Sequence, residues 1–187
     1  MSERGKIVIV AGPSGSVKST LITKFLKEHS HYIFPTSATT RKARPGETNG
    51  VQYHFITTEE FENSIENDGF LEWALVYDHY YGTLKSTVQI GLNEGKHFLK
   101  DIDIQGAKSL MNLLDKNDLK SIFISPPSLD LLKERLLARP KEDGANIETR
   151  ISEAKKEMEG AYLFDINIIN DNLDEAYESF KNFILTS

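Results

Sequence analysis

Residues 12–20 read Gly-Pro-Ser-Gly-Ser-Val-Lys-Ser-Thr and carry groups suited to binding nucleotide phosphates. They lie between an apolar run at 7–11 and a segment whose apolar residues recur at helical spacing. A loop of this kind curls backbone N–H groups around phosphate oxygens at the start of a helix. Lys18 then reaches the β- and γ-phosphates, and the Ser19 hydroxyl ligates Mg²⁺. The sequence therefore predicts a nucleoside triphosphate site built from Gly12, Pro13, Ser14, Gly15, Ser16, Val17, Lys18, Ser19 and Thr20.

One position departs from the loop pattern G-x-x-x-x-G-K-[ST], because Val17 replaces its second glycine. Glycine lets the backbone lie against the phosphates with no Cβ in the way, whereas valine adds a stiff branched side chain. We therefore expect weak ATP binding and low turnover. The helix behind the loop tolerates valine, so we expect little change in overall stability. The alternative, that Gly15 and Ser16 let the loop adjust and Val17 is harmless, stays open.

A second group of candidate residues lies between Ser37 and Thr83. Arg41 and Arg44 lie three residues apart, just before a proline–glycine turn, and arginine forks pair bidentately with phosphate oxygens. A carboxylate such as Glu72 can accept hydrogen bonds from the N1–H and 2-amino groups of a guanine, while a serine or threonine hydroxyl can donate one to its O6. Taken singly, these residues read as solvated loop charges and surface acids. The phosphate loop upstream favours the functional interpretation of the set.

Composition limits the class of protein and its partners. With 187 residues, 39% hydrophobic and 27% charged, the chain is a soluble globular protein of one domain. No apolar stretch approaches the roughly 18 residues that span a bilayer. The absence of cysteine excludes disulfides, thiolate metal sites and cysteine nucleophiles. A net charge of −6 argues against a broad nucleic-acid-binding surface. We expect a cytoplasmic protein with neither membrane nor nucleic acid as partner.

Strand and helix signals alternate along the chain around one irregular early insert. The expected strands are 6–11, 98–102, 120–124 and 166–169. The expected helices are 19–27, 58–68, 106–114, 128–137, 147–159 and 173–185. This alternation predicts an α/β fold with a parallel sheet covered on both faces. Ligands of such sheets bind at the carboxyl ends of the strands, where the glycine loop lies.

With these segments in view, the chain resembles the guanylate kinase family nearly end to end. The family pattern G-P-S-G-x-G-K-[ST] matches 12–19 except at Val17, and S-x-T-T-R-x-x-R-x-G-E matches 37–47. Shorter family segments match at 70–73, 80–83, 101–106, 126–128 and 170–173. The resemblance implies a P-loop NTPase-type parallel sheet core flanked by helices, with an inserted GMP-binding lobe and a short lid. It also implies transfer of the ATP γ-phosphate to GMP, giving ADP and GDP.

The same resemblance implies one guanylate-kinase-like domain over residues 1–187. Its core would comprise 1–33, 91–126 and 160–187. The GMP-binding lobe would be 34–90, and the lid with its flanking helices 127–159. Small-molecule nucleotides would be its partners, and both a monomer and a homodimer stay open.

Roles follow from the resemblance by position. The GMP phosphate would be held by Arg41, Arg44, Tyr53 and Tyr81, with Glu47 ordering their loop. The guanine would be read by Ser37, Glu72, Thr83 and Asp103. Charge on the transferring phosphoryl group would be neutralised by the catalytic set Lys18, Arg41, Arg139 and Arg150. Ser19, with Asp101, would hold Mg²⁺ directly or through water, and Asn170 would contact adenine.

Two further departures from the family pattern have physical consequences. Lys100 stands where the family usually has an apolar strand residue, so this lysine must snorkel, pair or occupy a less buried face. Pro140 follows Arg139 where a glycine is usual, which stiffens the expected lid.

Two alternatives to an active kinase remain open. One is a guanylate-kinase-like module that binds GMP or phosphorylated peptides without transferring phosphate. The other is a kinase disabled by Val17. Preference among GMP, dGMP and IMP is also open, although Glu72 favours bases that present N–H donors.

Overall fold

The computed structural model describes residues 4–76, 78–137 and 147–186. The helices are α1 (Lys18–Glu28), α2 (Thr58–Glu66), α3 (Lys85–Asn93), α4 (Ile104–Leu113), α5 (Leu129–Leu137), α6 (Ile147–Glu159) and α7 (Leu173–Leu185). The strands are β1 (Ile7–Ala11), β2 (Tyr32–Ile33), β3 (Ser37–Thr39), β4 (Tyr53–Phe55), β5 (Phe70–Val76), β6 (His79–Leu84), β7 (His97–Asp101), β8 (Leu119–Ser125) and β9 (Ile166–Ile169). Within these described residues, no helix has the length and apolar character that crossing a membrane requires.

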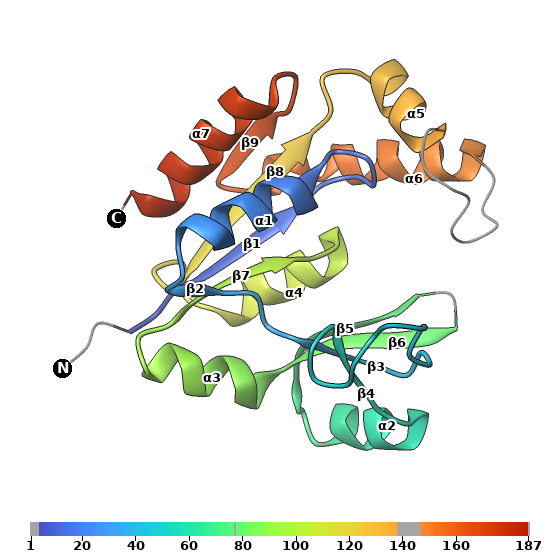
Figure 1. Ribbon diagram of the computed structural model, residues 1–187, viewed down its shortest axis with the longest axis vertical. Coiled ribbons are helices and arrows are strands. Elements are labelled where there is room, and N and C mark those ends of the chain that lie inside the picture. The colour runs from blue at the N-terminus through green and yellow to red at the C-terminus, as the bar shows by residue number, and fades with distance from the viewer. Residues whose placement is uncertain (1–3, 77, 138–146, 187) are drawn as a thin grey trace.

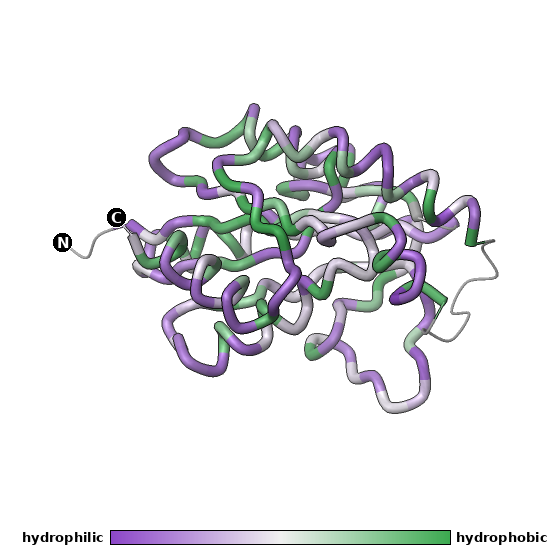
Figure 2. The backbone as a smooth tube through the Cα atoms, turned by 90° about the horizontal axis from the view of Figure 1, so that it is seen from above, coloured by the Kyte–Doolittle hydropathy of each residue, from purple (hydrophilic) through white to green (hydrophobic). Residues whose placement is uncertain are grey.

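A five-stranded parallel sheet forms the centre of the molecule, in the order β2-β7-β1-β8-β9. The predicted α/β architecture is therefore confirmed, and the four expected core strands are found within a residue or two of their predicted bounds. Every residue of β1 is buried, as expected for a strand covered on both faces. Figure 1 shows helices on both sides of this sheet, and Figure 2 shows hydrophilic segments along the outer turns of helices and loops.

The two faces of β1 bury different side chains because strand residues alternate in direction. Val8 and Val10 pack against apolar residues of α1 and α7. Ile7 and Ile9 pack on the opposite side, against residues of α3 and α4. The carboxyl end of β1, which carries the glycine loop, is thus fixed from both faces.

The region predicted as an irregular insert is in fact a second sheet, of order β4-β3-β6-β5, with α2 beside it. Its strands pair in a mixed pattern: β3 runs parallel to β4 and antiparallel to β6. Its small core is aromatic, because the Phe61 ring stacks on Phe70 at 4.1 Å and on Tyr80 at 5.1 Å. Strands of three residues, such as β3 and β4, are too short to show a period in the sequence.

Helices α5 and α6 pack on each other through Leu132, Leu136 and Ala154. Figure 1 shows this helix pair and the second sheet on either side of the edge where the core strands end. This arrangement leaves the glycine loop between two structural units that each carry candidate ligand-binding residues.

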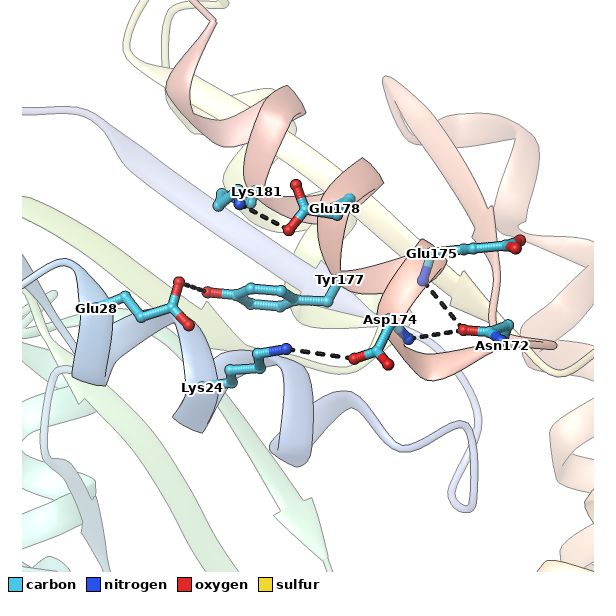
Figure 3. Close-up of polar contacts among 8 residues, drawn as sticks. All are labelled: Lys24, Glu28, Asn172, Asp174, Glu175, Tyr177, Glu178 and Lys181. Carbon is cyan, nitrogen blue, oxygen red and sulfur yellow. Dashed lines mark hydrogen bonds and ion pairs between the residues drawn. The ribbon is translucent and has the colours of Figure 1, made fainter.

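Helix α1, which follows the glycine loop, is held by contacts with α7 (Figure 3). The Tyr177 hydroxyl donates to the Glu28 carboxylate, and Lys24 lies 4.1 Å from the centre of the Tyr177 ring. Lys24 also pairs with Asp174 at 3.5 Å. Asn172 caps α7 by accepting from two backbone N–H groups in its first turn. These contacts fix the helix that begins directly after the glycine loop.

Candidate active site

The glycine loop turns the chain from β1 into α1 through backbone conformations that favour glycine. Gly12 has φ 142°, and a Cβ there would lie 2.2 Å from the carbonyl oxygen of Ile124. Gly15 has φ 90°, and its Cβ would meet a Leu132 methyl at 3.0 Å. The Ser16 N–H donates to the Pro13 carbonyl at 3.1 Å, which closes the turn. Glycine is therefore needed at both positions for close packing as well as for conformation.

Val17 is the residue before α1 and adopts the left-handed conformation, with φ 69° and ψ 24°. For a β-branched residue this is a strained backbone, which costs on the order of 1–2 kcal/mol relative to a conformation that L-residues prefer. Glycine has no such penalty. The expectation that valine affects overall stability little stays a prediction, and the structure adds that the strain of valine lies in the loop backbone rather than in the helix.

Lys18 closes the loop on itself. Its Nζ donates to the carbonyl oxygens of Gly12 at 2.6 Å and Pro13 at 3.3 Å. It also lies 3.9 Å from Asp101 Oδ1, at the end of β7. A cavity of about 400 Å³ opens here, lined by the loop together with Ser19, Asp101, Asp103 and others. An ammonium in this position is placed to exchange carbonyl oxygens for phosphate oxygens.

Acidic groups form the wall of this cavity opposite the loop. Burial raises the pKa of the Asp101 carboxyl, against the lowering effect of the Lys18 and Lys100 charges. Glu157 of α6 also lines the cavity, and burial raises the pKa of its carboxyl too. Sequence reasoning missed Glu157, because a glutamate on a charged helix carries no signal that distinguishes it from its neighbours.

The Arg41 guanidinium makes a two-pronged contact with the Glu47 carboxylate, at 2.9 Å for each bond. The backbone N–H of Arg44 donates to the same carboxylate at 2.6 Å. The hydrogen bonds from Arg41 and then Arg44 lower the pKa of Glu47 to about 2. Arg41 lies 5.5 Å from the Tyr53 ring, and Tyr53 and Tyr81 are neighbours at 5.8 Å. Glu47 therefore ties the loop of the two arginines together, while the Arg44 side chain is exposed.

A second cavity, of about 190 Å³, brings together residues of both sheets. Glu72 of β5 accepts a 2.6 Å hydrogen bond from the Thr83 hydroxyl of β6. The Lys100 ammonium of β7 donates to the Ser37 hydroxyl oxygen of β3. The lining comprises Ser37, Tyr53, Glu72, Ala74, Tyr81, Gly82, Lys100, Asp101, Ile102 and Asp103.

The two cavities are neighbours, because Asp101, Ile102 and Asp103 line both of them. Asp103 also caps α4 by accepting from the Gly106 N–H at 2.7 Å. On the far side of the glycine loop, Arg150 of α6 lies 3.4 Å from the Ser14 hydroxyl oxygen. The glycine loop thus lies beside a smaller pocket with carboxylates and hydroxyls in its wall.

Comparison with known proteins decides the family. The sequence model of the guanylate kinase family matches residues 4–187. The chain belongs to the guanylate kinase family. A guanylate kinase of Clostridium perfringens strain SM101 is 40% identical over 184 residues, covering 98% of this chain and 84% of that protein. One of Sulfurimonas denitrificans is 43% identical over 177 residues, covering 95% and 85%.

The fold of the family is matched as well. The crystal structure of guanylate kinase from Anaplasma phagocytophilum superposes with a TM-score of 0.77 at 28% identity. The match covers 98% of this chain and 86% of that one. The expected guanylate-kinase-like architecture is therefore confirmed over nearly the whole chain.

Asn170, expected to contact adenine, has a structural contact of its own. Its side chain is only 2% exposed, and its Nδ2 donates to the Ser16 carbonyl at 3.0 Å. The amide therefore supports the glycine loop from behind, and the adenine contact expected from the sequence stays a prediction. Arg139 and Pro140, expected in the lid, lie outside the described residues.

Arg135 is a further residue that sequence reasoning missed. It projects from α5 to the end of β9, where its Nη2 lies 3.4 Å from the Asn170 carbonyl oxygen. Its Nη1 is buried and has no hydrogen-bond partner among the described residues. Only the three-dimensional contact between α5 and β9 brings this guanidinium behind the loop.

Proposed function

We propose that this chain transfers the γ-phosphoryl group of ATP to GMP, and that Val17 weakens its ATP site. Membership of the guanylate kinase family makes it an enzyme of the ATP:GMP phosphotransferase class. One observation carries the assignment of partners to cavities. The glycine-loop cavity and the smaller pocket share a wall at Asp101–Asp103, so two nucleotides bound in them meet end to end.

In the proposed complex, ATP lies with its phosphates on the glycine loop and GMP lies in the pocket between the sheets. Lys18 and Arg150 neutralise negative charge on the transferring group from two sides of the loop. Arg41, Arg44, Tyr53 and Tyr81 hold the GMP phosphate, whose oxygen attacks the γ-phosphorus. No side chain acts as a nucleophile, because phosphoryl transfer depends on positioning and charge stabilisation.

The loop cavity also suits Mg²⁺. The Ser19 hydroxyl is exposed at the start of α1, and the Asp101 carboxylate faces the same cavity. Both are hard oxygen donors, and Mg²⁺ is commonly held by one or two such groups together with phosphates and water. When bound there, the ion supplies charge neutralisation on the phosphate oxygens.

Val17 limits this function in two ways. Its left-handed backbone strains the loop, and its branched side chain borders the loop cavity. Both effects oppose close approach of the phosphates to the backbone N–H groups. The pocket between the sheets does not include Val17, so GMP binding is independent of it.

A coupled assay of ADP release with ATP, Mg²⁺ and GMP tests the proposal. We expect turnover that requires GMP and rises when Val17 is changed to glycine. Absence of turnover in both proteins would contradict it. The strain at Val17 favours one second candidate, a module that binds GMP or a phosphorylated peptide without transfer. That candidate predicts GMP binding in calorimetry and no ADP release from either protein.

A further inference from the structure

Lys100 is a charged residue in the interior of the central sheet. It lies on β7 beside Ile9 of β1, and the lysine is 9% exposed. Alternation along β7 places Leu99 with the α1–α7 side of the core and Phe98 with the other side. Lys100 follows the direction of Phe98, toward the second sheet. A lysine here is costly unless its ammonium meets polar partners.

The partners of this ammonium are incomplete. Nζ donates to Ser37 Oγ and lies 5.5 Å from the Phe34 ring. Among the described residues, no carboxylate lies within ion-pair distance of it. The charges of Glu72 and Asp101 are nevertheless close enough to raise the pKa of Lys100 against the larger lowering effect of burial. Lysine has three donors and no acceptor, and the hydrogen bond to Ser37 uses only one of them. Lys100 lines the small cavity, so a ligand bound there can accept from the remaining donors.

The bond to Ser37 also fixes which way its hydroxyl acts. Because Lys100 can only donate, Ser37 Oγ is the acceptor, and its own hydrogen must point elsewhere. Ser37 lines the same cavity. The cavity wall therefore presents hydrogen-bond donors at Lys100 and Ser37, whereas Glu72 presents acceptors.

We propose that Lys100 is a specificity-determining residue, which selects a 6-oxopurine by donating, together with Ser37, to the acceptor edge of the base. Guanine presents O6 and N7 as acceptors, and lysine reads this edge in other nucleic acid contexts. Adenine presents a 6-amino donor there, which would face two donors. The inference rests on the proposed placement of GMP in this cavity, and it adds a contact that the residues Ser37, Glu72, Thr83 and Asp103 do not supply.

The test compares nucleotide binding by the full chain in the absence of ATP, so that the glycine loop plays no part. Calorimetry measures GMP and AMP affinity for the unaltered protein, for Lys100→Met and for Lys108→Met, an exposed lysine of α4 that serves as control. We expect Lys100→Met to lower the ratio of GMP to AMP affinity by about tenfold to a hundredfold. The control should keep the ratio. An unchanged ratio in Lys100→Met, or equal loss for both nucleotides, would overturn the inference.

A ligand-side measurement keeps the test independent of one variant. 2-Aminopurine riboside 5′-monophosphate keeps the 2-amino group of GMP but lacks both its 6-oxo group and its N1–H, so only the part of the affinity gap that depends on Lys100 reports on the 6-oxo edge. The unaltered protein should bind it about tenfold or more weakly than GMP, and this gap should shrink in Lys100→Met or, if that variant does not fold, in Lys100→Gln. A gap of the same size in the variant contradicts the role of Lys100. Failure of the proposed function is a separate result, namely binding of GMP with the expected ratio but no ADP release.

Discussion

The side-chain amide of Asn170 donates to the carbonyl oxygen of Ser16, a residue 154 positions earlier in the chain. This bond joins the end of β9 to the glycine loop, and both residues are buried. The loop is therefore shaped by the C-terminal part of the core as well as by its own glycines. This amide therefore stabilises the glycine loop in the protein without bound nucleotide.

Asn170→Ala should therefore lower stability even without ligand. The change leaves the buried Ser16 carbonyl without its donor, which should cost about 1–3 kcal/mol in the free energy of unfolding. Urea denaturation measures this, with Asn112→Ala on the exposed side of α4 as control. Unchanged stability with loss of ATP affinity alone would instead support the adenine contact expected from the sequence.

Val17→Gly should raise both activity and stability. Relief of the left-handed strain should raise the free energy of unfolding by roughly 1–2 kcal/mol. The added conformational freedom of glycine in the unfolded chain should offset about half of that gain. We expect a net gain below about 1 kcal/mol, and a rise of at least roughly tenfold in kcat/KM for ATP, or about 1.4 kcal/mol.

Val17→Ala separates the two effects of valine. It keeps the strained backbone but removes the methyl groups that border the loop cavity. If side-chain bulk dominates, its kinetics will resemble those of Val17→Gly; if strain dominates, they will resemble those of the unaltered protein. Equal kcat/KM for ATP in all three proteins would show that Val17 is harmless.

Glu72→Gln should weaken GMP binding and leave the fold intact. The carboxylate is held by Thr83 and faces the small cavity, where it accepts from the base in the proposed complex. Loss of a charge-assisted hydrogen bond should cost roughly 1.5–3 kcal/mol of binding free energy. Calorimetry with Glu59→Gln on exposed α2 as control checks this. GMP affinity equal to that of the control would remove Glu72 from base recognition.

Glu47 should make the stability of the arginine loop depend on pH in the acid range. Its pKa is lowered from 4.5 to about 2 by Arg41 and by the Arg44 N–H. A lowered pKa in the folded state means that the contribution is complete above about pH 4.5 and is lost as the pH falls toward 2. Glu47→Gln should therefore be less stable than the unaltered chain near neutral pH. The difference should shrink as the pH falls from about 4.5 and should vanish only below about pH 2, and a difference that stayed constant across this range would argue against the ion pair.

The second sheet should move toward α5 and α6 when both nucleotides bind, because the arginines proposed to bind phosphate lie on units flanking the core. The chain contains no cysteine, so spin labels on Asn63→Cys and Lys155→Cys report one distance cleanly. We expect pulsed electron resonance to show a shorter distance with GMP and an ATP analogue together. Identical distances in the free and doubly liganded protein would contradict closure.

Much of this architecture could be predicted from the sequence, and the reasons are local. The long apolar strand at 7–11 and the amphipathic helices carry clear periods, and the glycine loop carries a motif whose offsets are fixed by phosphate geometry. The second sheet could not be predicted, because β3 and β4 have three residues each and gain their stability from pairing across the chain. The part played by Asn170, Arg135 and Lys100 depends on contacts between distant segments. The left-handed backbone at Val17 is implied by the missing glycine, but only the structure shows it.

The separate aromatic core at Phe61 should make the second sheet an independent unit of local unfolding. Its buried core consists of Ala38, Phe61 and Phe70, separate from the two larger clusters of the central sheet. Regions with so few buried contacts open at lower free energy than the rest of the molecule. Amide hydrogens of β3–β6 should thus exchange with solvent as one cooperative group while those of β1 and β8 stay protected. A nucleotide that binds against this sheet would then also order it, and the free energy of that ordering would form part of the affinity for the nucleotide.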